Sequence, residues 1–102
     1  MTVIWTIPAK YRLKEIYLYY KHTASVTIAK NLIKKIFETT RSLPPNPKMG
    51  SVEGLLKHKK EEYRYLVKGN YKILYKMKGE EIFITDIFDC RQNPEKMKVD
   101  IR

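Results

Sequence analysis

The stretch from residue 63 to 94 constrains the fold more than any other part of this 102-residue chain. β-Branched and aromatic residues, which suit a pleated and half-buried surface, fill three runs there. The runs are Tyr63–Val67, Tyr71–Lys78 and Ile82–Asp89. Gly69 and Gly79 separate them, and glycine supplies the positive φ that tight hairpins require. The stretch therefore predicts an antiparallel three-stranded meander.

The second of these runs has two different faces, because side chains alternate across a strand. One face carries Tyr71, Ile73, Tyr75 and Met77. The opposite face carries Lys72, Lys76 and Lys78, with Leu74 among them. Arg91 follows just past the end of the third run, where functional residues often lie.

The N-terminal half predicts a strand followed by two helices. A short apolar run around Trp5 ends at Pro8, a residue that suits the first turn of a helix. From Ala9, apolar residues recur at helical spacing: Leu13, Ile16, Tyr17 and Tyr20. Thr23 and Ser25 each offer an N-cap oxygen for a second helix. That helix has a broad apolar stripe made of Ile28, Ala29, Leu32, Ile33, Ile36 and Phe37.

These elements predict a single α+β domain over residues 1–102, with a short N-terminal strand, a two-helix hairpin and then the meander. The helices should cover one face of the sheet, and the place of the first strand in it stays open. Lys10, Arg12 and Lys14 are expected to face solvent. The predicted core residues are Trp5, Leu13, Ile16, Leu32, Ile36, Tyr75 and Ile84.

Between the prolines of residues 44–47 and the meander lies a connection, residues 48–60, with a basic cluster at residues 57–60. Long loops in small domains are often functional. The formal net charge is +10, which favours anionic partners, although a lysine-rich solvated surface would account for the same charge.

Composition also argues against several other classes. Cys90 is the only cysteine, so no internal disulfide is possible, as is usual in the cytoplasm. No apolar run approaches the ~20 residues of a membrane span, and the N-terminus lacks the pattern of a signal peptide. His22 and His58 do not have the spacing of metal ligands, so neither a metal nor a cofactor is expected.

The order of elements, together with Tyr71-Lys72-Ile73-Leu74-Tyr75 and Arg91-Gln92-Asn93-Pro94, resembles the RelE/ParE superfamily of bacterial type II toxin–antitoxin toxins over nearly the whole chain. The long helical hairpin and the Arg-Gln-Asn-Pro ending are more similar to the ParE, or plasmid stabilisation, branch. This resemblance implies a cytoplasmic, growth-inhibiting toxin that acts on DNA gyrase. It also implies neutralisation by a cognate antitoxin, which the charge predicts to be acidic overall. A dimer, or a heterotetramer with the antitoxin, is compatible with the resemblance.

The mRNA-cleaving branch of the superfamily is the alternative, and it would make the protein a metal-independent endoribonuclease acting on mRNA at the ribosome. In that branch, basic residues stabilise the attacked phosphate while the ribose 2′-OH acts as nucleophile. The resemblance carries this role over to Arg64, Lys72 and Arg91. Contacts with the target or with nucleic acid are assigned to Arg64, Lys72, Lys76 and Arg91.

The chain departs from the mRNA-cleaving pattern at several positions. Lys72 lacks the bidentate fork of arginine. Leu66 occupies a position where a second basic residue would be expected, and Met97 stands about where some ribosome-dependent toxins have a tyrosine. No carboxylate is placed as an obvious general base. A third possibility is a basic nucleic-acid-binding module without toxicity, although no RNA-recognition, helix-turn-helix or zinc signature is present.

Overall fold

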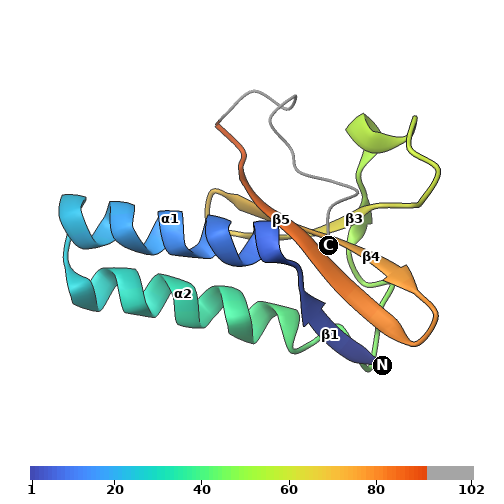
Figure 1. The fold of residues 1–102 in the computed structure, drawn as a ribbon, viewed down its shortest axis with the longest axis horizontal. Coiled ribbons are helices and arrows are strands. Elements are labelled where there is room, and N and C mark those ends of the chain that lie inside the picture. Colours follow the sequence, from blue (N-terminus) through green and yellow to red (C-terminus); the bar gives the residue numbers. More distant parts are fainter. Residues whose placement is uncertain (92–102) are drawn as a thin grey trace.

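The computed structural model of the protein describes residues 1–91 and has an α+β fold, as the sequence predicts (Figure 1). A two-helix hairpin packs on one face of a five-stranded sheet whose strand order is β1-β5-β4-β3-β2. The elements in chain order are β1 (Thr2–Trp5), α1 (Ile7–Thr23), α2 (Val26–Thr40), β2 (Ser51–Val52), the 3₁₀ turn η1 (Gly54–Leu56), β3 (Arg64–Lys68), β4 (Tyr71–Lys78) and β5 (Glu81–Asp89).

Side-chain caps set the start of each helix. Thr6 Oγ1 accepts a hydrogen bond from Ala9 N at 3.4 Å and donates one to Ile84 O at 2.8 Å, so the start of α1 is fixed to β5. Ser25 caps α2 by accepting from Ile28 N at 3.1 Å. Thr23, the other predicted cap, instead donates its hydroxyl to Tyr19 O within α1. Figure 1 shows the hairpin extending beyond one end of the sheet.

The predicted meander is confirmed as β3, β4 and β5, joined at Gly69 and Gly79 with φ of 59° and 61°. β1 joins the sheet as an edge strand parallel to β5, a place that the sequence left open. β2 adds a two-residue strand antiparallel to β3, within the segment predicted to be a loop. No helix among residues 1–91 is long and apolar enough to span a membrane.

A β-bulge interrupts the pairing of β4 with β5. Leu74 pairs with Asp86 and Tyr75 pairs with Ile84, which leaves one extra residue in β5. Beside this bulge the fully buried Asp86 reaches α1, where its Oδ1 accepts from Arg12 Nε at 3.0 Å. Arg12, which was predicted to face solvent, is therefore only partly exposed, because its guanidinium reaches this buried carboxylate.

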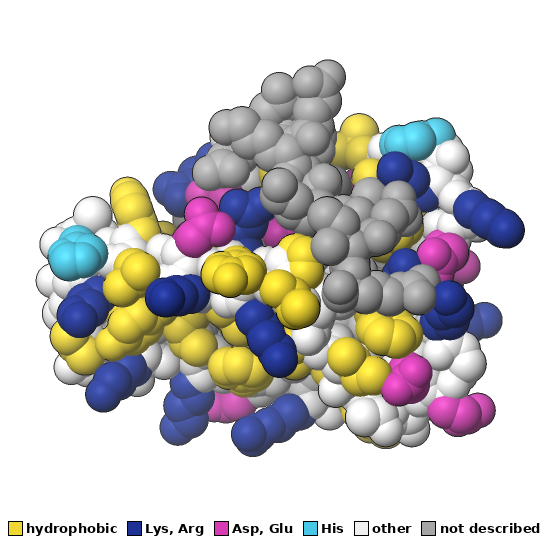
Figure 2. Space-filling model, in the orientation of Figure 1, with side chains coloured by type: hydrophobic (Ala, Val, Ile, Leu, Met, Phe, Trp, Pro, Cys, Tyr) yellow, Lys and Arg dark blue, Asp and Glu magenta, His cyan; other side chains and the backbone are white. Residues whose placement is uncertain are grey.

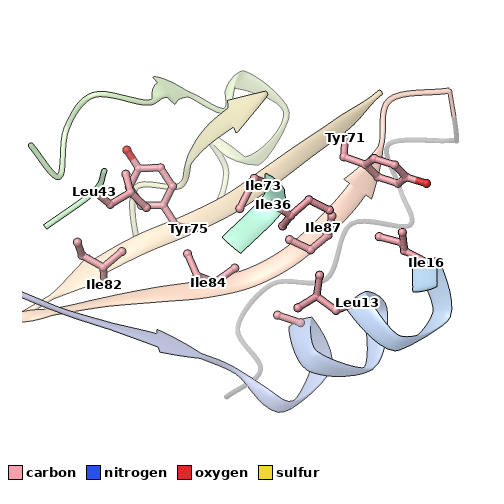
Figure 3. Packing of buried hydrophobic residues seen from close by; sticks show 11 residues of the cluster. Leu13, Ile16, Ile36, Leu43, Tyr71, Ile73, Tyr75, Ile82, Ile84 and Ile87 are labelled. Carbon is pink, nitrogen blue, oxygen red and sulfur yellow. The ribbon is translucent and has the colours of Figure 1, made fainter. Parts of the chain in front are cut away.

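The main core lies between the helices and the sheet, here called the helix side (Figure 3). Five of the seven predicted core residues are buried there: Leu13, Ile16, Ile36, Tyr75 and Ile84. Trp5 and Leu32 are partly buried and pack against this cluster. The predicted stripe on α2 is wider than the buried face, because Ile28 is 52% exposed.

The opposite face of the sheet is contacted by residues 53–62, a segment here called the strap. This face of the sheet is called the strap side. Leu56 of the strap packs in a second, smaller cluster with Tyr63, Leu74 and Phe88. The two clusters use alternate residues of the same strand, as the predicted two-faced pattern of β4 requires.

Candidate functional site

Two of the predicted site residues, Lys72 and Lys76, lie beneath the strap. Lys72 Nζ lies 2.8 Å from Glu53 Oε2 and 4.4 Å from the centre of the Tyr65 ring. Lys76 Nζ lies 2.9 Å from Glu61 Oε1, and the Lys76 side chain is only 1% exposed. Both ammonium groups are thus paired with strap carboxylates, with Lys76 fully buried and Lys72 partly exposed.

Arg64 lies on the other side of the sheet from these two lysines. It pairs across the strands with Tyr75, whose ring belongs to the helix-side core. Its guanidinium donates to Gly50 O at 2.8 Å and to Lys48 O at 3.2 Å, and it forms an ion pair with Glu62 at 2.9 Å. Arg64 therefore binds the backbone at the start of the segment that leads into the strap.

Tyr75 holds the same segment from within the core. Its hydroxyl accepts from Gly50 N at 2.9 Å and donates to Pro47 O at 2.8 Å. Burial raises the pKa of Tyr75, although the hydrogen bond from Gly50 acts in the opposite direction. A Cβ at Gly50 would lie 2.6 Å from the Tyr75 hydroxyl and from Tyr65 O, so this close approach requires glycine.

Arg91 lies at the end of β5, at a third place. Its guanidinium forms two hydrogen bonds with Asp89, at 3.0 and 2.8 Å, and this contact lowers the pKa of the Asp89 carboxyl. The Arg91 side chain is 61% exposed and borders a hollow of about 340 Å³ between α1 and β5. Burial, together with the hydrogen bond to Tyr20, raises the pKa of Tyr71 in the wall of this hollow.

The structure thus distributes the four predicted site residues over three places. Lys72 and Lys76 lie under the strap, Arg64 lies on the helix side, and Arg91 lies at the hollow. Residues 92–94 and Met97 fall outside the described part of the chain. Among residues 1–91, no three His, Cys, Asp or Glu side chains are grouped as metal ligands.

Sequence reasoning missed the partners of these basic residues, namely Glu53, Glu61 and Glu62. A signal was present, because the three acids flank the basic run at residues 57–60. Their pairing with residues of β3 and β4 depends on how the strap folds back, which local spacing does not reveal.

A groove between α1 and α2 was also missed. It has a volume of about 370 Å³ and is lined by Tyr17, Lys30, Ile33, Lys34, Phe37, Glu38 and Arg41. The Phe37 ring packs against the ring of Trp5, with ring centroids 4.9 Å apart. Figure 2 shows hydrophobic side chains intermixed with Lys and Arg over the helices. The helical spacing of these α2 residues was the available signal.

Comparison with known proteins agrees with this architecture. The chain matches the family described as "ParE toxin of type II toxin-antitoxin system, parDE" over residues 3–94. A solved structure, "Chromosomal ParDE TA system from P. aeruginosa", has a similar fold, with a TM-score of 0.73 and 23% sequence identity. The match covers 87% of this chain and 95% of that one. A comparison with curated protein sequences returns no significant match. Because the family match spans nearly the whole chain, this protein belongs to the ParE toxin family of type II toxin–antitoxin systems.

Proposed function

We propose that this toxin inhibits DNA gyrase in the cytoplasm and is neutralised by a cognate, acidic antitoxin. Membership of the ParE family supports the proposal. The observation that favours it over the mRNA-cleaving alternative is the pairing of Lys72 and Lys76 with Glu53 and Glu61. Gyrase inhibition requires no RNA-cleaving constellation on the sheet.

The same geometry argues against ribonuclease activity. Stabilising a phosphoryl transition state requires several cationic groups that are aimed at one point before the reaction. Lys76 is buried, and Arg64 lies on the far side of the sheet from Lys72. Either lysine would have to leave its carboxylate to reach a phosphate, and an unpaired charge left behind in a buried site is costly.

Arg91 is the most exposed of the four predicted site residues, so it is the best candidate for a target contact. Wild-type protein should inhibit supercoiling or trap cleaved DNA in a gyrase assay while leaving mRNA intact on translating ribosomes. Arg91→Ala should weaken inhibition by about tenfold, the scale of one charge-assisted hydrogen bond.

Lys78→Ala, which removes an exposed charge elsewhere on the sheet, is the control and should inhibit normally. Cleavage of mRNA on ribosomes by the wild-type protein, slowed ~10²-fold in Arg91→Ala, would instead assign the protein to the ribonuclease branch.

For the antitoxin we propose the groove between α1 and α2 as the docking site, occupied by an acidic amphipathic segment. Ile33 and Phe37 offer apolar contacts, whereas Lys30, Lys34 and Arg41 offer positive charge beside them. Helices commonly bind grooves through such spaced apolar anchors, and opposite charge accelerates association.

A charge reversal tests this docking site. Lys34→Glu should slow association with the antitoxin and weaken the salt dependence of binding, because attraction is replaced by repulsion in the groove. Lys35→Glu makes the same change on an exposed α2 residue that does not line the groove, so it should have a smaller effect. Equal effects of the two variants would contradict the groove as the docking site.

A further inference from the structure

α1 is apolar on two opposite faces. Its inner face packs into the helix-side core through residues spaced three or four positions apart, namely Ala9, Leu13, Ile16 and Tyr20. A second series with the same spacing lies on the outer face and consists of Ile7, Tyr11, Lys14, Leu18 and Lys21, here called the outer stripe. The two series are offset by two residues, which is just over half a helical turn, so they point in opposite directions.

The apolar members of the outer stripe are exposed. Ile7 is 60% exposed, Tyr11 is 64% exposed and Leu18 is 39% exposed. Figure 2 shows hydrophobic side chains interrupted by Lys and Arg where Figure 1 shows α1. A surface helix usually carries polar residues opposite the core, and single exposed apolar residues need no explanation. Three that align along one helical face instead indicate a surface that binds a partner.

The outer stripe is fixed in place before any partner binds. Thr6 caps α1 and also donates to Ile84 O, so the start of the helix is held on β5. A surface held in this way loses little conformational freedom on binding, which favours affinity. Apolar anchors spaced along one helical face are typical of a helix that binds in an apolar groove of another protein.

The charge beside the stripe selects the kind of groove that fits it. Lys10, Lys14 and Lys21 are exposed, and Glu15 is the only acidic residue of α1. Two copies of the protein that paired through this face would bring like charges together. A groove with acidic residues along its rim would instead attract these lysines.

On one flank, the outer stripe adjoins the place of the proposed target contact. Glu15 and Tyr19 line the hollow that Arg91 borders. Glu15 lies four residues after Tyr11 and three residues before Leu18, so the stripe and the hollow are neighbours on the surface of α1.

On its other flank, the stripe adjoins the groove between α1 and α2. Tyr17, which lines that groove, lies three residues after Lys14 and four residues before Lys21. A segment bound in the groove therefore lies beside the stripe.

We infer that the outer stripe of α1 inserts into an apolar groove with an acidic rim on the target protein. The inference rests on the proposed function, which makes gyrase that target. Arg91 then contacts the same protein beside the stripe. An antitoxin segment in the groove between α1 and α2 obstructs this contact, which gives neutralisation a steric cause.

The test measures inhibition of gyrase supercoiling by purified variants. Tyr11→Ala with Leu18→Ala, the stripe variant, should raise the toxin concentration required for half-inhibition by about tenfold or more, the scale of one interface anchor. The matched control is Ile28→Ala with Val67→Ala, which removes two exposed apolar side chains from α2 and β3 and should inhibit normally. Thermal unfolding checks that each variant remains folded.

A charge reversal tests the acidic rim separately. Lys14→Glu places a carboxylate against that rim and should weaken inhibition, whereas Lys35→Glu makes the same change on an exposed residue of α2 and should have a smaller effect. Equal effects of the two variants would show a general effect of net charge and would contradict the rim.

The remaining outcomes distinguish the inference from the proposed function. Normal inhibition by the stripe variant would overturn the inference alone, whereas a wild-type protein that does not inhibit gyrase would overturn both. Normal inhibition with lost antitoxin affinity would assign the stripe to the antitoxin. A wild-type dimer in sedimentation that becomes a monomer in the stripe variant, with inhibition unchanged, would assign it to a second copy. Either of these results would overturn the inference.

Discussion

The helix side and the strap side of the sheet are closed by different chemistry, although the same strand supplies side chains to both. On the helix side, Ile73 and Tyr75 of β4 meet apolar residues of α1 and α2. On the strap side, Lys72 and Lys76 of the same strand meet carboxylates, with only a small apolar cluster around Leu74. A helical hairpin presents a continuous apolar stripe, whereas a short segment of successive turns does not.

This difference indicates which side of the sheet contributes more to the free energy of unfolding. Burial of apolar surface is favourable without a specific partner, so the helix side should dominate the free energy of unfolding. A buried ion pair contributes less net stability because both charges lose their hydration, but breaking it by removing one partner is costly. The strap side should therefore tolerate removal of a whole pair better than removal of half of one.

The largest effect is expected from a cavity on the helix side. Ile36→Ala removes part of a side chain with no exposed surface and should lower the free energy of unfolding by roughly 2–5 kcal/mol. Ile28→Ala, on the same helix but 52% exposed, should change it by less than about 0.5 kcal/mol. Urea unfolding measures both, and similar losses would mean that the hairpin does not carry the core.

The next largest effect is expected from half of a strap-side pair. Glu61→Gln leaves the buried Lys76 ammonium without its carboxylate and should lower the free energy of unfolding by about 1–3 kcal/mol. The loss should not be larger, because the Glu61 side chain is one-third exposed and solvent already weakens the ion pair. The double variant Glu61→Gln with Lys76→Met should recover most of that loss, because no buried charge remains. A double variant as unstable as the single one would show that the unpaired lysine is not the cause.

A smaller effect is expected on titration of the helix-side tyrosines. Burial raises the folded-state pKa of Tyr71 and Tyr75. Their contribution to the free energy of unfolding is therefore complete below the unfolded-state pKa and is lost as the pH rises through the folded-state pKa. The free energy of unfolding should then fall above about pH 10, by on the order of 1 kcal/mol per pH unit for each tyrosine. Thermal unfolding at increasing pH should show that the stability of Tyr71→Phe declines less steeply than that of the wild type. Tyr11→Phe, which changes an exposed tyrosine, should decline like the wild type. If Tyr71→Phe also declined like the wild type, titration of Tyr71 would not be the cause.

The smallest effect is expected at Asp89, which lies at the end of β5 and pairs across the strands with Tyr71. Its pKa is lowered by the hydrogen bonds from Arg91, so its contribution is present above the unfolded pKa and is lost as the pH falls through the folded pKa. Asp89→Asn should therefore destabilise the protein slightly at neutral pH and not in acid, as is usual for an exposed ion pair. Chemical denaturation at the two pH values measures this, and a loss of stability that persists in acid would contradict the ion-pair explanation.

Local sequence signals were sufficient for the helices and the meander. Helical spacing, the Ser25 cap and the two glycine turns each act over a few residues, so their meaning does not depend on the rest of the fold. Side-chain alternation likewise predicted the two faces of β4 correctly. Such local signals do not show whether basic residues from several strands form one site, and the four predicted site residues lie at three places.

The sequence by itself determined the α+β class, the element order and the ParE-like resemblance, because these depend on patterns along the chain. Only the tertiary structure decided that Arg64 faces away from Lys72, that β1 pairs with β5, and that the β5 bulge brings Asp86 to Arg12. It also decided that Glu53 and Glu61 of the strap pair with Lys72 and Lys76 of β4. Each of these outcomes joins residues far apart in the chain, and their register and burial are set by packing rather than by local preference.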